Sequence, residues 1–160
     1  MAVELDELDL RIVEILLRDG RTPAAQLAEQ IGLSRPAVAD RIEKLERNGV
    51  IRGTTAVVDP VALGQRITAF VAARGPKLTA KTWAIFRDLM RRSEVLEVHT
   101  VAGDDCFLLK VRTESIQTLN ELVNELTHPP LSLSTRTTIV MQTHCEKVGG
   151  IVLGELEEGK

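Results

Sequence analysis

The chain of 160 residues carries a formal net charge of −3 at pH 7, and 44% of its residues are hydrophobic, which allows one domain or two small ones with packed cores. The negative balance excludes a protein that coats nucleic acid through its overall charge, so any contact with DNA must come from a local basic patch. No run of 18 apolar residues and no basic-then-apolar N-terminus occurs, and we therefore expect a soluble cytoplasmic protein without a membrane span or signal peptide.

The first segment, between Val3 and Arg18, has apolar residues at helical spacing and ends at Asp19-Gly20. The apolar stripe consists of Leu5, Leu8, Ile12, Ile15 and Leu16. Such a stripe predicts a helix that packs in a core, with its early acidic residues, Glu4, Asp6, Glu7 and Asp9, near the positive end of the helix dipole.

Residues 21–52 are predicted to form a helix, a tight turn and a second helix. Thr22 is the expected cap of the first helix, Pro23 its first residue, and Gly32 its terminator. Ser34 is the expected cap of the second helix, which ends at Asn48-Gly49. The apolar residues of these helices are Ala24, Leu27, Ala28 and Ile31, then Val38, Ile42 and Leu45.

The second helix of this pair leaves a polar face that we expect to point outward: Arg35, Ala39, Asp40, Arg41 and Lys44. Residues 1–33 hold three arginines and seven acidic residues, whereas residues 34–52 hold five basic and three acidic residues. This geometry and local charge favour a recognition helix for the major groove of DNA. The alternative is a helical hairpin with a solvated charged face, supported by pairs such as Asp40 with Lys44 and Glu43 with Arg47.

Beyond Gly49 the pattern changes from helical to strand-like. A linker with short β-prone runs and a turn at Asp59-Pro60 is expected over residues 53–65. Strands are then predicted over 66–75, 95–103, 106–113 and 134–147, and helices over 79–93 and 115–126. The resulting order, β-α-β-β-α-β, is that of a ferredoxin-like unit, in which both helices cover one face of an antiparallel sheet.

The uncovered face of this sheet is expected to bind a second subunit. Val71, Val98 and Ile139 suggest apolar residues on both faces of the strands, and they cannot all lie under the helices. The sequence therefore predicts a homodimer. Residues 148–160 are expected to form an acidic exposed tail, in which Ile151 to Leu153 could add a strand or arm to the partner.

No cofactor or metal site is predicted. Cys106 and Cys145 lack CxxC spacing, which favours reduced thiols, and the three histidines are not at metal-binding spacing. No nucleophile and base stand at a workable spacing either, so an enzyme on a ferredoxin-like scaffold is the least favoured alternative.

The segment GLSRPAVADRIEKLERNGVI resembles the DNA-binding half of the Lrp/AsnC family of transcription regulators, LDELDLRIVEILLRDGR is similar to the first helix of that family, and the resemblance continues to about residue 147. It implies an α+β protein with a winged helix-turn-helix domain over residues 1–52 and a linker strand over 53–65. An effector-binding and dimerisation domain of ferredoxin-like fold would follow over 66–147, and a C-terminal tail over 148–160.

With the helical pattern, the resemblance points to contacts with double-stranded DNA. Arg35, Lys44 and Arg52 are expected on phosphates, and Arg41 and Ser34 at the bases. The full expected DNA-binding set is Ser34, Arg35, Pro36, Ala39, Asp40, Arg41, Lys44 and Arg52.

The resemblance also assigns an effector loop between two predicted strands, where the family has a Gly-Asp-Xaa-Asp-Tyr-like motif. Gly103 and Asp104 match it, and Phe107 keeps the aromatic ring, but Cys106 stands where a second aspartate is often found. The alternative for Gly103-Asp104 is an ordinary hairpin turn. The expected effector set is Gly103, Asp104, Asp105, Cys106, Thr135, Arg136 and Thr137; Arg136 would bind a carboxylate or form a surface ion pair.

The expected function is that of a sequence-specific transcription regulator. A small molecule, such as an amino acid, would bind between dimers that assemble into an octamer. An architectural DNA-binding protein without an effector is the alternative, because the departure at Cys106 removes one carboxylate from the expected ligand site.

Overall fold

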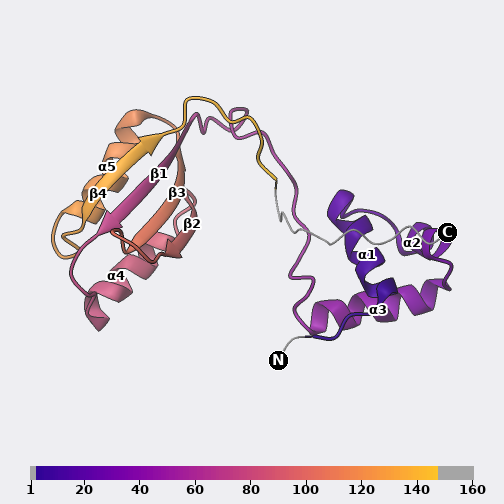
Figure 1. Cartoon of the computed structure of the whole chain (residues 1–160). Helices are drawn as coiled ribbons and strands as arrows, with labels where there is room; N and C mark the ends of the chain where they lie inside the picture. Colours follow the sequence, from indigo (N-terminus) through magenta and orange to yellow (C-terminus); the bar gives the residue numbers. More distant parts are fainter. Residues whose placement is uncertain (1–2, 148–160) are drawn as a thin grey trace. The chain divides into compact units, whose positions relative to one another are not determined.

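The computed structural model describes residues 3–147, which form two compact units (Figure 1). The division falls between Val57 and Val58, inside the segment expected as a linker, and the second unit ends at Glu146. None of the described helices is long and apolar enough to cross a bilayer. The expected tail, with its possible arm at Ile151 to Leu153, lies outside the described residues.

The first unit contains three helices: α1 (Glu7–Arg18), α2 (Ala24–Ile31) and α3 (Arg35–Arg47). Their apolar faces meet in one core, in which Ile12, Leu27, Val38 and Leu45 are at most 1% exposed. Each short helix depends on this shared core for most of its stability, because isolated helices of this length are marginal in water. The predicted three-helix arrangement is confirmed.

The ends of these helices follow the predicted capping residues, with one exception. Gly32 ends α2 in the left-handed conformation at φ 73°, and the Ser34 hydroxyl accepts a hydrogen bond from the backbone N–H of Ala37 at 3.4 Å. The prediction of Thr22 as the cap of α2 is wrong. Pro23 occupies the cap position without a side-chain hydrogen bond, while the Thr22 hydroxyl donates to the carbonyl of Asp19 at 2.8 Å.

The linker strand expected over residues 53–65 is not present. Residues 52–59 are neither helix nor strand, and residues 60–64 form a turn in which the Gln65 N–H donates to the Pro60 carbonyl at 2.9 Å. Val57 and Val58 remain 79% and 54% exposed. A β-prone segment becomes a strand only when a neighbouring strand takes up its backbone hydrogen bonds, and none of the strand pairings among the described residues includes residues 53–65.

The second unit has the predicted β-α-β-β-α-β order. It comprises β1 (Ile67–Arg74), α4 (Ala80–Met90), β2 (Val95–Thr100), β3 (Phe107–Thr113), α5 (Ile116–Thr127) and β4 (Ser134–Ile139). The strands form one antiparallel sheet in the order β2-β3-β1-β4. The last strand is shorter than the predicted 134–147, since its ladder to β1 ends at Ile139.

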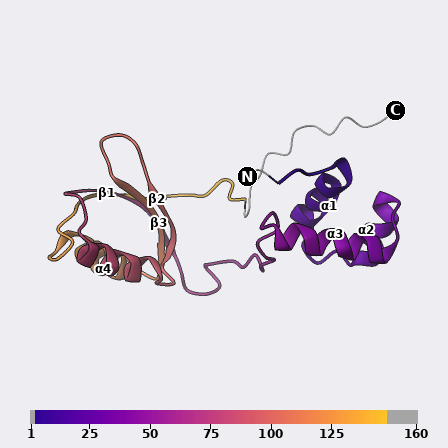
Figure 2. The same ribbon diagram turned by 90° about the horizontal axis from the view of Figure 1, so that it is seen from below.

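Both helices of this unit cover the same face of the sheet (Figures 1 and 2). The core between them contains Val71, Phe86, Leu109 and Leu122, each at most 1% exposed. The ring centroids of Phe86 and Phe107 are 4.7 Å apart, within the range for favourable aromatic pairs.

The three residues from which a second subunit is predicted all lie on the side of the sheet that the helices cover. The expectation that they cannot all lie under the helices is therefore wrong. Val71 is buried in the core under the helices, Val98 packs against the same core, and Ile139 pairs with the core residue Ala69. Residues directly opposite each other on paired strands share a face, which places Ile139 on that side despite its 41% exposure at the sheet edge. The uncovered face instead carries Phe70 of β1 and the residue opposite it on β3, Lys110.

Candidate functional site

The outward surface of α3 is the first candidate site. Ser34, Arg35 and Pro36 are exposed at its N-terminal end, and Ala39, Asp40 and Lys44 continue the exposed surface along the helix. Val38 and Leu45 hold the opposite side of α3 in the core. Arg52 is exposed a few residues after the helix ends. The structure thus brings seven of the eight expected DNA-binding residues to the surface.

Arg41 differs from the other members of the set, and the prediction that it faces outward is wrong. Its side chain is 26% exposed, and Nη1 donates to Asp6 Oδ2 at 2.7 Å and to Asp9 Oδ1 at 2.6 Å. Spacing explains this orientation, because Arg41 stands three residues after Val38 and four before Leu45, on the core side of α3. The same spacing could have shown it from the sequence.

The acidic partners of Arg41 form the start of α1. The Asp6 carboxylate accepts from the Asp9 N–H at 2.8 Å, and the Asp9 carboxylate accepts from the Asp6 N–H at 3.3 Å. The Asp9 N–H and then Arg41 hold the pKa of Asp6 below its ordinary value, while the Asp6 and Asp9 carboxylates raise the pKa of Arg41. These contacts favour the ionised forms of Asp6 and Arg41. From the sequence alone, Asp9 is expected only to lie near the positive end of the α1 dipole.

The remaining basic residues near α3 differ in their pairing. Arg47 and Glu43 form the expected i,i+4 ion pair at 3.6 Å. Within residues 3–147, Arg35, Lys44 and Arg52 make no ion pair, and the suggested pair of Asp40 with Lys44 is not formed. Arg35, Lys44 and Arg52 are therefore the cations near α3 that are available to phosphates.

The expected effector loop lies between β2 and β3. The Val101 N–H donates to the Cys106 carbonyl at 3.1 Å, and the Cys106 N–H donates to the Ala73 carbonyl at 2.9 Å, which ties the loop to the end of β1. Gly103 has φ 145°, a conformation that L side chains rarely adopt. Asp104 is exposed next to it.

Of the three β4 residues assigned to this site, Arg136 lies against the loop. Its Nη2 donates to Asp105 Oδ2 at 2.8 Å, which is the surface ion pair considered for it. Arg136 pairs with Ala72 of β1, while Thr135 and Thr137 pair with Ala73 and Val71 on the other face of the sheet. The prediction that all three residues line one site is therefore wrong, because adjacent side chains on a strand point to opposite faces.

Hollows of ligand size occur elsewhere in the sheet unit. One of about 410 Å³ lies against the uncovered face, lined in part by Phe70, Lys110 and Glu146, and one of about 380 Å³ lies beside the start of α5. Neither reaches residues 103–106. In the single described chain, Gly103 and Asp104 of the effector loop are exposed, whereas Asp105 and Cys106 are partly buried.

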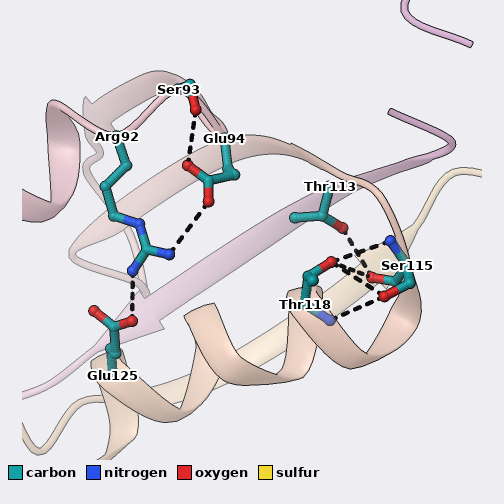
Figure 3. Close-up of polar contacts among 7 residues, drawn as sticks. All are labelled: Arg92, Ser93, Glu94, Thr113, Ser115, Thr118 and Glu125. Atoms are coloured by element: carbon teal, nitrogen blue, oxygen red, sulfur yellow. Dashed lines mark hydrogen bonds and ion pairs between the residues drawn. The ribbon is translucent and has the colours of Figure 1, made fainter. Parts of the chain in front are cut away.

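Polar contacts beside the second hollow fix neighbouring elements rather than form a reactive cluster (Figure 3). Arg92 lies between Glu94 and Glu125 and connects the segment after α4 to α5. Ser115 and Thr118 form reciprocal hydrogen bonds that cap the first turn of α5. All of these groups have partners within the fold, so their arrangement is explained by structure alone.

Comparison with known proteins covers both units. Residues 5–52 match the family model for winged helix-turn-helix DNA-binding, and residues 68–149 match the model for the Lrp/AsnC ligand binding domain. The HTH-type transcriptional regulator FL11 of Pyrococcus abyssi is 37% identical over 147 residues, which cover 91% of this chain and 95% of FL11.

Solved structures agree with these matches. The structure of E. coli AsnC has a TM-score of 0.79 and 30% identity, covering 91% of this chain and 98% of that one. The complex of the regulator NMB0573 from Neisseria meningitidis with L-Met has a TM-score of 0.81 over 90% of this chain and 94% of that one. At 20% identity, that similarity establishes the fold alone.

Proposed function

The chain belongs to the Lrp/AsnC family of transcription regulators, and on that premise we propose that it binds specific DNA sites as a homodimer whose assembly responds to an amino acid. The observation that carries the proposal is the exposed polar surface of α3, held in place by the apolar core on its other side. This is the arrangement of a recognition helix. In a cell without a nucleus, the DNA lies in the cytoplasm, and we propose that this regulator acts there.

Phosphate contacts come from the exposed cations Arg35, Lys44 and Arg52 in this proposal. The exposed residues in the first half of α3 meet the base edges, where Ala39 suits a thymine methyl group and Asp40 suits a cytosine amino group. Ser34 and Pro36 complete this contact surface. A two-fold dimer would present two such helices to half-sites one helical turn, or a multiple of it, apart.

Effector binding is proposed near residues 103–106, between dimers of a larger assembly such as an octamer. The match to the Lrp/AsnC ligand binding domain supports a small-molecule ligand, and the L-Met complex of NMB0573 suggests an amino acid. Arg136 can bind a carboxylate bidentately once its ion pair with Asp105 opens. Because that pair is exposed, opening it costs about 1 kcal/mol or less.

The test is fluorescence anisotropy of the purified chain on duplex DNA from upstream of its own gene and on a scrambled duplex, with and without a pool of amino acids. Tighter binding to the upstream duplex that changes with the pool supports the proposal. Preference without any response to the pool contradicts the effector, and equal affinity for both duplexes favours the architectural alternative. Absence of binding to either duplex at low salt would refute the proposal that α3 is a recognition helix.

A variant of the loop separates an effector role from a structural one. Asp104→Ala should abolish ligand-induced changes in assembly, measured by light scattering, and leave the basal dimer intact. Loss of the dimer itself would show that the loop is structural.

A further inference from the structure

We infer that the ion pair between Asp9 and Arg41 sets the position of the recognition helix, so that a buried carboxylate of α1 controls DNA affinity without touching DNA. The inference rests on the proposed function, since it assumes that α3 enters the groove. It gives Arg41 the role of a positioning residue instead of the base contact expected from the sequence.

The burial of Asp9 is the first observation. Asp9 is 2% exposed and is the one fully buried charged residue among residues 3–147. An ionised carboxylate in an apolar core is strongly unfavourable unless it is paired and hydrogen-bonded. Its Oδ1 accepts from Arg41 at 2.6 Å and its Oδ2 accepts from the Asp6 N–H at 3.3 Å, so both oxygens are satisfied.

The second observation is that one nitrogen of Arg41 joins two positions of α1. Nη1 contacts both Asp6, the cap of α1, and Asp9, three residues further on. These two residues also cap each other through their backbone N–H groups. The start of α1 and the middle of α3 therefore form a single hydrogen-bonded unit.

The hydrogen bonds between α1 and α3 restrict the rotation of α3 in a way that the apolar core does not. Apolar packing of Val38 and Leu45 is strong but not directional, and it tolerates small rotations of a helix. Charge-assisted hydrogen bonds are short and angle-dependent. Asp40, the residue before Arg41, is exposed on the proposed DNA surface. A rotation of α3 that strains the ion pair would therefore displace that surface as well.

Different experimental results are expected if Arg41 contacts a base and if it only positions α3. A base contact affects discrimination at one base pair, and Asp9 should then be irrelevant to DNA. A positioning pair affects all sequences alike, and changes to Asp9 and Arg41 should have the same effect. Neither residue neutralises a phosphate in the positioning model, so the salt dependence of binding should not change.

The experiment compares Asp9→Asn and Arg41→Lys in the full chain, with two exposed controls outside the proposed DNA-binding set, Glu46→Gln on α3 and Glu7→Gln on α1. Affinities are measured by anisotropy on the upstream duplex and on duplexes with single base-pair changes. We expect both pair variants to bind about tenfold more weakly on every duplex, the scale for residues coupled in one network. Both control variants should bind every duplex as the parent chain does.

A second variant keeps the test decisive if Asp9→Asn fails to fold. The double change Asp9→Leu with Arg41→Met replaces the pair by apolar side chains, which often preserves or raises stability. We expect it to melt at or above the parent temperature by circular dichroism and still bind DNA weakly. Parent-like affinity of a folded double variant would overturn the inference.

Two other outcomes also overturn it: parent-like binding by Asp9→Asn, or a loss confined to one base pair in Arg41→Lys. Failure of the parent chain itself to bind DNA would instead refute the proposed function. The two failures are therefore distinguishable.

Discussion

Removing one exposed cation from α3 should change how DNA affinity depends on salt. Lys44 is exposed, as are Arg35 and Arg52, and none of the three is ion-paired within the part of the chain that the structure describes. Each phosphate that a cation neutralises contributes about −0.9 to the slope of log K against log salt concentration. Three cations from each subunit of a dimer give a slope of about −5.

The variant Lys44→Gln removes one of these cations from each subunit. The slope should therefore become shallower by about 2, with weaker binding at low salt and little change in the preference between duplexes. The assay is anisotropy on one duplex between about 50 and 200 mM salt, the range over which phosphate contacts change affinity most.

Lys81→Gln is the matched control, because Lys81 is also an exposed lysine on a helix, α4 of the sheet unit. It should leave the slope unchanged. An unchanged slope in Lys44→Gln would refute the phosphate contact, and a shallower slope in Lys81→Gln would show that the sheet unit also contacts DNA.

Three further predictions concern stability. Ser34→Ala removes the side-chain cap of α3 and should lower the free energy of unfolding of the helical unit by about 1 kcal/mol in urea titrations, whereas Ser34→Asp should not. Phe86→Ala opens a cavity in the core of the sheet unit and should cost about 3–5 kcal/mol; calorimetry should show that transition lowered or lost while the helical unit still melts, and a parent-like scan would contradict the packing. Lys110 and then Arg112 hold the pKa of Glu146 below its ordinary value, so the unfolded chain takes up this proton first as the pH falls. The stability that Glu146 contributes is present above the ordinary pKa of a glutamate and is lost as the pH falls through the lowered one; Glu146→Gln should flatten this part of the stability curve, and an equally steep acid loss in the variant would rule the pair out.

Much of the fold follows from local signals along the chain. Ser34 and Ser115 cap helices where the sequence predicted, and Gly32 ends a helix in the left-handed conformation. The order of strands and helices in the second unit also follows from the change in hydrophobic period after Arg66. These signals act over one or two turns, which is why residue type and spacing alone reveal them.

Two of the errors concern positions that depend on a partner far along the chain. The β-prone residues around Val57 stay irregular because no neighbouring strand in the described unit pairs with them. Thr135, Arg136 and Thr137 are adjacent in sequence and are therefore expected at one effector site. In the register of β4 against β1, the two threonines lie on the face of the sheet opposite to Arg136. Register is a property of two strands together, and neither strand carries it alone.

For Arg41, the sequence and the tertiary structure each determine a different property. Its spacing from Val38 and Leu45 already placed it on the core side of α3, so the sequence by itself determined which way the side chain turns. That its guanidinium meets Asp6 and Asp9, some thirty residues earlier, was decided only by the packing of α1 against α3. Periodicity orients a residue about the axis of its own helix, whereas the identity of its partner depends on how a second helix is placed beside it, and that placement is set by the shared core.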